Sequence, residues 1–292
     1  MTHKALVVRL EQVIGMDGSP RRLRSAIESE LADYFGLPSI QASERAELVE
    51  SAVARLIARR LADSERMGTT PILSLLGTSS DIVAGFCYVL PEDEPYLSTI
   101  KQQRVYAGPL LAAIRGLSFE EFEKFGSRIL SEMGARFSCV TPHSGDQGID
   151  FYGQLSMGQL HGIPAPFLKL THSVVILFAG QAKHYPTNPV GPEVVRELIG
   201  AVSLARTKTF SKPEIDIFRD LNLKPFSPLV TLLFSTGDFT RGAIELADSA
   251  GVVTQSGEQL SVFLADKGIG IVVKDGFPAF DRQVFIEWLN GA

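Results

Sequence analysis

The second half of the chain alternates short apolar runs with amphipathic helical patterns, and this alternation restricts its fold more than any other feature. The run SVVILFAGQAK (173–183) is apolar over most of its length, and a helical pattern follows it over 191–205. A second strand and helix are expected at 228–235 and 239–251, with a further strand at 252–254. Strands that alternate with helices predict an α/β sheet with helices on both faces.

A capped helical pattern precedes these strands. The segment SFEEFEKFGSRILSEMG (118–134) carries apolar residues at helical spacing. Ser118 has the residue type of a helix cap, and Glu121 follows three residues later, which is the spacing of a capping box. Two short strands are expected after this helix, near 135–140 and 149–155. The region from 117 to the end therefore predicts a mixed sheet flanked by helices.

Residues 1–90 follow a different pattern. Apolar residues recur every four positions over 23–31 and again over 49–61, which predicts two helices. Ser19–Pro20 has the residue types of a cap followed by a first helical position, so the first of these helices is expected to begin there. Two short strand candidates follow within 72–90. Helices followed by a hairpin are the order of a winged helix-turn-helix, so we expect a mainly helical, winged-helix-like domain.

The second helical pattern of this region ends in a basic stretch. A charged helix face is usually only solvated surface, and a DNA-reading face is the alternative. The arginines available on that face are Arg55, Arg59, Arg60 and Arg66.

The stretch 91–116 contains prolines and an acidic cluster, and we expect a linker there. The expected domains are therefore a DNA-recognition domain over 1–90 and a catalytic domain over 117–292. The formal net charge of the chain is -5, but residues 1–70 and 117–225 each hold equal numbers of basic and acidic residues. The overall acidity is thus no objection to a nucleic-acid partner, although it indicates binding through local grooves.

Only two cysteines are present, too few for a disulfide framework or a four-cysteine zinc site. No apolar run reaches the roughly 20 residues that a membrane span needs, and charged residues interrupt the apolar N-terminal stretch. We therefore expect a cytoplasmic protein with no membrane partner.

The chemistry is expected at the end of the apolar strand. The turn SGDQGID (144–150) places Asp146 and Asp150 near a strand start, although most such turns only connect strands. Gln181 and Lys183 alternate at the end of 173–183, so their side chains share one face. A buried lysine needs a partner, and Asp150 is the expected one.

Oxygen ligands and a lysine at adjacent strand ends suit phosphodiester chemistry. Asp150 has the ligand type that Mg²⁺ or Mn²⁺ prefers, and Gln181 offers a second oxygen. Glu123 on the opening helix could complete the metal shell. Lys183 could stabilise the negative charge that develops on the phosphate.

Several motifs together resemble a known family. These are FEKFGSRILSEMG, HSGDQGID, GQAKHY, VGPEVVRELIGAV and LLFSTGDFTRGAIELADSAGV, in this order over roughly 117–265. They look like the Mrr-type restriction endonuclease domain of the PD-(D/E)xK nuclease superfamily. Mrr-like domains characteristically carry glutamine at the superfamily's second acidic position, which fits Gln181.

The resemblance implies a Mg²⁺-dependent endonuclease that cleaves DNA, often foreign or modified DNA, and commonly carries an N-terminal winged helix. By this resemblance Asp150, Gln181 and Lys183 align with the catalytic core and Glu123 with the helix acid. Asp146 matches an additional acidic position.

Other residues beside these motifs have two interpretations each. His143 and His184 flank the expected site and could be auxiliary proton carriers, although the resembled family does not depend on a histidine. Arg241 opens a helix, where it could contact phosphate, whereas the neighbouring Thr240 is better explained as a helix cap. The insertion 156–172 could contact DNA, form a dimer or have no function.

Cutting both strands requires two active sites or sequential nicking, so a homodimer or higher homo-oligomer is expected. One alternative is a catalytically inactive DNA-binding protein with a nuclease fold. Another is a nuclease that acts on RNA or branched DNA.

Overall fold

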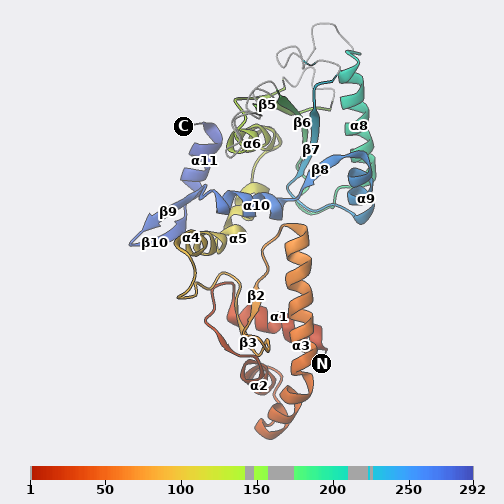
Figure 1. The fold of residues 1–292 in the computed structure, drawn as a ribbon. Coiled ribbons are helices and arrows are strands. Elements are labelled where there is room, and N and C mark those ends of the chain that lie inside the picture. The colour runs from red at the N-terminus through yellow and green to blue at the C-terminus, as the bar shows by residue number, and fades with distance from the viewer. Residues whose placement is uncertain (1, 142–147, 157–173, 210–222, 224–225, 292) are drawn as a thin grey trace, which may run out of the picture. The chain divides into compact units, whose positions relative to one another are not determined.

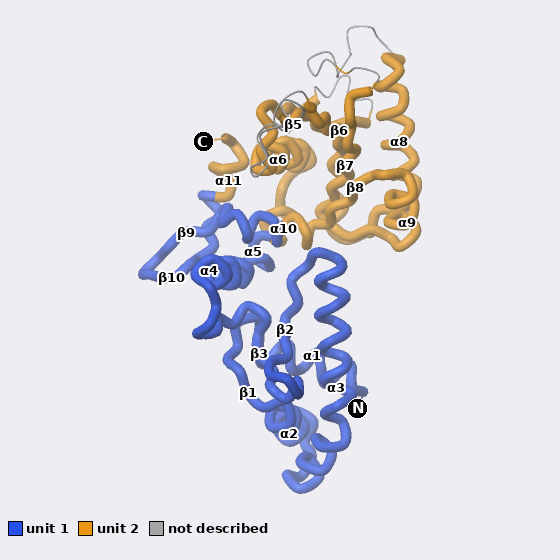
Figure 2. The backbone as a smooth tube through the Cα atoms, in the orientation of Figure 1, with its two compact units in different colours: residues 1–110, 261–284 blue, residues 111–260, 285–292 orange. Residues whose placement is uncertain are grey.

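The computed structural model describes residues 2–141, 148–156, 174–209, 223 and 226–291. These residues divide into two compact units, 1–110 with 261–284 and 111–260 with 285–292 (Figure 2). The chain passes between the units within three helices, α5 (Ala107–Arg115), α10 (Gly257–Asp266) and α11 (Arg282–Asn290).

The first unit begins with three helices and a small sheet. Its elements in this part are α1 (His3–Ile14), β1 (Arg21–Arg22), α2 (Leu23–Asp33), α3 (Ser39–Met67), β2 (Leu73–Leu76) and β3 (Ile82–Gly85). The strands form an antiparallel sheet in the order β1-β3-β2. Helices followed by a hairpin are the element order expected from the sequence for this mainly helical region. The expected helix start at Pro20 is wrong, because Arg21 and Arg22 pair with β3 and α2 begins at Leu23.

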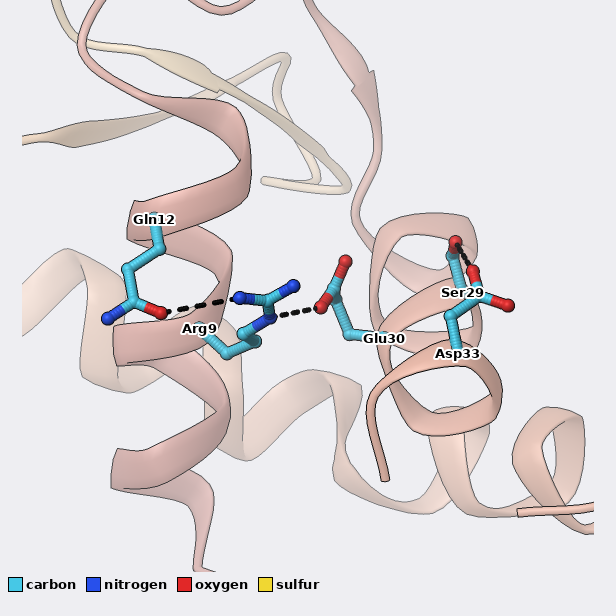
Figure 3. A network of polar contacts seen from close by, with 5 residues as sticks. All are labelled: Arg9, Gln12, Ser29, Glu30 and Asp33. Atoms are coloured by element: carbon cyan, nitrogen blue, oxygen red, sulfur yellow. Dashed lines mark hydrogen bonds and ion pairs between the residues drawn. The ribbon is translucent and has the colours of Figure 1, made fainter. Parts of the chain in front are cut away.

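The helices α1, α2 and α3 pack around one apolar core, and a part-buried ion pair joins α1 to α2. Arg9 Nε donates to Glu30 Oε2 at 2.7 Å, and Glu30 is buried (Figure 3). The Arg9 guanidinium also lies 4.3 Å from the centre of the Tyr34 ring. Glu30 thus lies in the core with its charge compensated, as burial of a carboxylate requires.

The stretch 91–116, expected as a linker, contains α4 (Pro95–Arg104) and α5. The first unit also contains a hairpin of β9 (Ile271–Lys274) and β10 (Phe277–Phe280). Cys87 is buried, and this burial raises the pKa of its thiol to about 11.

The second unit is a five-stranded mixed sheet with helices on both faces, as the sequence predicts (Figure 1). The strand order is β4-β5-β6-β7-β8, with β4, β5 and β6 antiparallel and β6, β7 and β8 parallel. The elements are α6 (Phe119–Glu132), β4 (Phe137–Val140), β5 (Phe151–Ser156), β6 (Val175–Lys183), α8 (Pro192–Arg206), β7 (Leu229–Ser235), α9 (Arg241–Ala250) and β8 (Val252–Gln255). Ser118 and Glu121 form the expected capping box at the start of α6.

The two faces of this sheet bury different side chains. Leu177 and Ala179 of β6 face a core with Val194 and Leu198 of α8. On the α6 side, the Phe151 ring fills the space between helix and sheet, because neither neighbour has a side chain there. A Cβ added to Gly126 of α6 would lie 2.4 Å from that ring, and one added to Gly180 of β6 would lie 2.2 Å from it.

Replacing Gly180 by alanine is therefore expected to lower the free energy of unfolding by about 1–3 kcal/mol, because the Phe151 ring or the sheet must move. Gly200→Ala is the matched control, since no atom lies within 4 Å of a Cβ there and the residue is inside α8. Alanine at 200 should raise stability by up to about 1 kcal/mol. Denaturant unfolding measures both changes, and equal effects at the two sites would contradict this packing.

Candidate active site

Polar side chains replace apolar ones at the carboxyl end of β6. Gln181 continues the face of Leu177 and Ala179, and only 4% of it is exposed. Its Nε2 atom lies 3.5 Å from the position that a Cβ on Gly148 would take. Its Oε1 atom is buried and has no hydrogen-bond partner among the described residues. A buried amide oxygen without a partner is costly unless it has a ligand, so this atom marks a binding position.

Asp150 lies one residue before β5 and is held against the end of β6. Its N–H donates to Gly180 O at 2.9 Å, and its Oδ2 accepts a hydrogen bond from the N–H of Ala182 at 2.7 Å. Only 7% of Asp150 is exposed. The sequence predicts Lys183 as the partner of this carboxylate, and the contact that the structure gives for Oδ2 is the backbone of the residue before that lysine. The two contacts fix the carboxylate beside Gln181.

Lys183 is the last residue of β6 and is half-buried. It is paired in parallel register with Ser235 of β7, and its carbonyl oxygen accepts from Thr236 N at 3.1 Å. The carboxyl ends of two parallel strands therefore meet at this lysine. In open α/β sheets that edge is where ligands bind.

The opening helix lies against the same end of β6. The His184 ring is 5.1 Å from the Phe119 ring and 6.3 Å from the Phe122 ring, measured between centroids. Glu123 follows Phe122 on α6 and is half-buried. Nδ1 of His184 is buried, and no described group hydrogen-bonds to it. The structure thus brings the helix that carries Glu123 to the strand end that carries Lys183.

Three of the expected features fall on residues that the structure does not describe. His143 and Asp146 lie within 142–147, and the insertion expected over 156–172 lies in 157–173 except for Ser156, the last residue of β5.

The residues at the end of β6 fit a hard divalent cation. Mg²⁺ prefers oxygen ligands, takes one or two carboxylates and keeps several waters. Asp150 offers a carboxylate, and Gln181 offers a buried oxygen without a partner. Within the described ranges no three His, Cys, Asp or Glu side chains are grouped to hold a metal. The donors therefore suit a cation bound through few protein atoms rather than a closed structural site.

Thr141 is a residue at this site that the sequence did not single out. It follows β4 directly, and its N–H donates to Asp150 O at 2.8 Å. Only 3% of it is exposed, and its Oγ1 is buried without a described partner. In the sequence it is only a hydroxyl residue between the expected strand 135–140 and the SGDQGID turn. Hydroxyl residues are common in turns and caps, so its type alone does not indicate a site.

The expected DNA-contacting arginines differ in their surroundings. Arg55 and Arg59 are exposed on α3, and Arg59 Nε is 3.9 Å from Asp63 Oδ2. Arg60 pairs with Glu11 of α1 at 2.5 Å and so connects two helices of the first unit.

Arg241 on α9 is 92% exposed and pairs with Glu245 at 2.7 Å. Beside it, Thr240 caps α9 by accepting a hydrogen bond from Ala243 N at 3.2 Å, as expected.

A groove of about 520 Å³ lies in the first unit, between the start of α2, the middle of α3 and the β2–β3 turn. Its lining residues are Arg22, Arg24, Ser25, Glu50, Ser51, Ala54, Ser79, Ser80 and Asp81. Ser79 donates to Asp81 at 2.7 Å, and this hydrogen bond holds the pKa of that carboxyl below its usual value. Arg24 pairs with Glu50 at 2.9 Å, whereas Arg22 is exposed. The sequence did not single out Arg22 or Arg24.

Comparison with protein families identifies part of the chain. Residues 114–211 match the restriction endonuclease family model of the Mrr catalytic domain. This segment is similar to the catalytic domain of Mrr-type restriction endonucleases. The match confirms the resemblance and contains Glu123, Asp150, Gln181 and Lys183, whereas 212–265 lies beyond it.

Two restriction endonucleases of known structure are similar to the chain. MspJI in complex with a 27-mer oligonucleotide is 22% identical, with a TM-score of 0.36, and the similarity covers 62% of this chain and 36% of MspJI. FokI bound to DNA is 10% identical, with a TM-score of 0.35, and the similarity covers 91% of this chain and 44% of FokI. The chain thus spans less than half the length of either enzyme. No curated protein matches the chain significantly. No helix among the described residues is long and apolar enough to cross a membrane.

Proposed function

We propose that this chain is an endonuclease that hydrolyses phosphodiester bonds of DNA with Mg²⁺ or Mn²⁺, acting in the cytoplasm in restriction of, or defence against, foreign or modified DNA. One observation carries the proposal. The buried Gln181 Oε1 has no partner among the described residues and lies beside the fixed carboxylate of Asp150, with Lys183 two residues further on. The match of 114–211 to a restriction endonuclease model supports the same function.

Each residue of the site has a distinct role in this proposal. Asp150 and Gln181 bind the cation through oxygen, and Glu123 approaches from α6. When bound, the cation polarises a phosphate oxygen and lowers the pKa of a water molecule. The backbone N–H of Ala182 holds Asp150 in place, so its carboxylate needs no reorganisation on binding. Lys183 stabilises negative charge that develops on the phosphate.

The proposed function assigns a role to each segment of the chain. We propose that residues 1–90 bind DNA, that 91–116 connect them to the nuclease, and that 117–292 carry out the cleavage. Cutting both strands at one position requires two nuclease sites, so the active form is a homodimer or a higher homo-oligomer.

The proposal is tested by incubating the protein with supercoiled plasmid, single-stranded RNA and four-way DNA junctions, each with Mg²⁺, Mn²⁺ or EDTA. Cleavage of plasmid in both metals and not in EDTA is the expected result. Plasmids with and without methylated bases distinguish a modification-dependent enzyme. Preferred cleavage of RNA or of four-way junctions would show that this nucleic acid, and not duplex DNA, is the substrate. Binding without cleavage in either metal would indicate an inactive nuclease fold.

The DNA-binding role of the first unit makes a separate prediction. Arg22 in the groove and Arg55 on α3 are both exposed and have no ion pair among the described residues. Replacing both by alanine should weaken DNA binding and make the slope of log affinity against log salt shallower by about two, because two phosphate contacts are lost. Fluorescence anisotropy in EDTA at several salt concentrations measures both.

Two single variants serve as controls for this measurement. Arg282 is exposed on α11 and belongs neither to the groove nor to α3, so Arg282→Ala should leave DNA binding unchanged. Arg60→Ala should lower stability and leave the salt slope unchanged, because Arg60 pairs with Glu11. An unchanged slope in the Arg22 and Arg55 double variant would show that these arginines do not contact DNA.

A further inference from the structure

The ends of β4, β5 and β6 lie side by side at the proposed cation position. Asp150 directly precedes β5, Gln181 belongs to β6, and Thr141 follows β4, which has no role so far. The N–H of Thr141 donates to Asp150 O at 2.8 Å, and Asp150 Oδ2 accepts from Ala182 N at 2.7 Å. Thr141 and Gln181 therefore flank Asp150 on its two sides, from the ends of β4 and β6. Neighbouring strands are about 4.8 Å apart, so Thr141 and Gln181 each lie one strand spacing from Asp150.

Side-chain alternation places both neighbours of Asp150 on one face of the sheet. Cys139 of β4 and Ala179 of β6 pack against the core under α8. Thr141 and Gln181 each follow two residues later, which returns the side chain to that face. The hydroxyl and the amide oxygen thus come from two strands to the face that also carries Lys183.

Both oxygens are in a state that the hydroxyls of Thr70 and Thr236 share among the described residues. Thr141 Oγ1 and Gln181 Oε1 are buried, and neither has a hydrogen-bond partner in the part of the chain that the structure describes. A buried hydroxyl without a partner destabilises a protein, so natural proteins rarely keep one without a ligand. Two such oxygens on either side of one carboxylate are explained together by one bound cation.

We propose that the Thr141 hydroxyl is a third oxygen of the cation position, on the side of Asp150 away from Gln181. A threonine hydroxyl is an established ligand type for Mg²⁺ in phosphate-transfer sites. The inference rests on the proposed function, because it assumes that Asp150 and Gln181 bind a divalent cation. It adds a ligand from the residue that follows β4, so that the ends of β4, β5 and β6 all contribute to the site.

The test measures cation binding without DNA, so it does not depend on cleavage. Mn²⁺ binding to the full chain is measured by isothermal titration calorimetry for the parent protein and for Thr141→Val, Thr141→Ser and Thr141→Ala. Valine keeps the shape of threonine and removes the hydroxyl, whereas serine keeps the hydroxyl. The serine and alanine pair repeats the comparison without the methyl group, in case valine disturbs folding.

Asp150→Asn and Thr231→Val are measured beside these variants. Asp150→Asn tests the proposed cation position itself. Thr231 is a half-buried strand threonine of β7 that the proposal places outside the site, so it is the matched control.

Thr141→Val should weaken Mn²⁺ binding about tenfold, because one of the three protein oxygens that hold the cation is lost. Thr141→Ser and Thr231→Val should bind as the parent does, and Thr141→Ala should bind as valine does. In EDTA, Thr141→Val should unfold at the same temperature as the parent or a higher one, because a buried unpaired hydroxyl is removed. A purely structural threonine would lower that temperature without weakening Mn²⁺ binding.

Two outcomes overturn the inference and are distinguishable from each other. If Thr141→Val binds Mn²⁺ as tightly as the parent while Asp150→Asn does not, Thr141 is not a ligand and the proposed function stands. If the parent protein itself binds no Mn²⁺, the cation position is wrong, and both the proposed function and this inference fail.

Discussion

Replacing Asp150 by asparagine is expected to slow plasmid cleavage at least about 1000-fold, the largest effect of any single change in this chain. Asparagine has nearly the same shape, and its oxygen can still accept the hydrogen bond from Ala182 N. What it lacks is the negative charge that a divalent cation requires, and electrostatic groups of this kind contribute factors of about 100–1000 or more. Cleavage rates under single-turnover conditions measure the loss.

The matched control for this variant is Asp248→Asn, an exposed aspartate on α9. It makes the same chemical change away from the site and should cleave at the parent rate. Both variants should unfold at temperatures close to that of the parent. An Asp150→Asn protein that is folded and cuts within about threefold of the parent rate would show that the carboxylate has no part in the chemistry.

Replacing Lys183 by methionine is expected to slow cleavage about 100-fold or more. Methionine keeps the unbranched aliphatic stem and removes the ammonium group, which stabilises charge on the phosphate in the proposed mechanism. The variant should be at least as thermostable as the parent, because a half-buried charge is removed from the end of β6. A rate loss without a stability loss separates a role in catalysis from a role in folding.

Lys267→Met is the control for the charge change, since Lys267 is an exposed lysine of the first unit. It should cleave at the parent rate. Mn²⁺ binding gives a second distinction, because Lys183→Met should bind the cation at least as tightly as the parent, whereas Asp150→Asn should not. Equal cleavage by Lys183→Met and by the parent protein would remove the lysine from the proposed site.

The sheet of the second unit could be predicted because its strands and helices have strong local patterns. The apolar run that forms β6, the capping box at Ser118 and the period of α8 each arise from burial on one face of an element. These patterns depend on neighbours within a few residues. The same holds for α2 and α3 of the first unit.

The wrong helix start arose where a local pattern has two physical meanings. Ser19 and Pro20 have the residue types of a helix start, but the two arginines that follow pair with β3 instead. Prolines and charges in 91–116 predict a connecting segment, and the structure adds that this segment is helical, with Pro95 in the first turn of α4. Contacts that are distant in sequence decide between such meanings, and one sequence does not contain them.

The candidate site could be predicted as a set of residues but not as a geometry. Gln181 and Lys183 follow from strand alternation, and the resemblance assigned Asp150 and Glu123 to the same place. The sequence could not show that Asp150 accepts a hydrogen bond from Ala182 N, nor that Gln181 Oε1 is buried without a described partner. Thr141 was missed because a hydroxyl residue before a turn is common, and only its burial and lack of a described partner make it unusual.

The most direct measurement of the central claim is cleavage of supercoiled plasmid by the purified protein, with Mg²⁺ and with EDTA, on DNA with and without modified bases. The account predicts nicked or linear plasmid in Mg²⁺ for at least one of these DNAs, no product in EDTA, and no product from Asp150→Asn in either condition. Plasmid that stays supercoiled with every divalent cation, or cleavage that persists in EDTA, would contradict it.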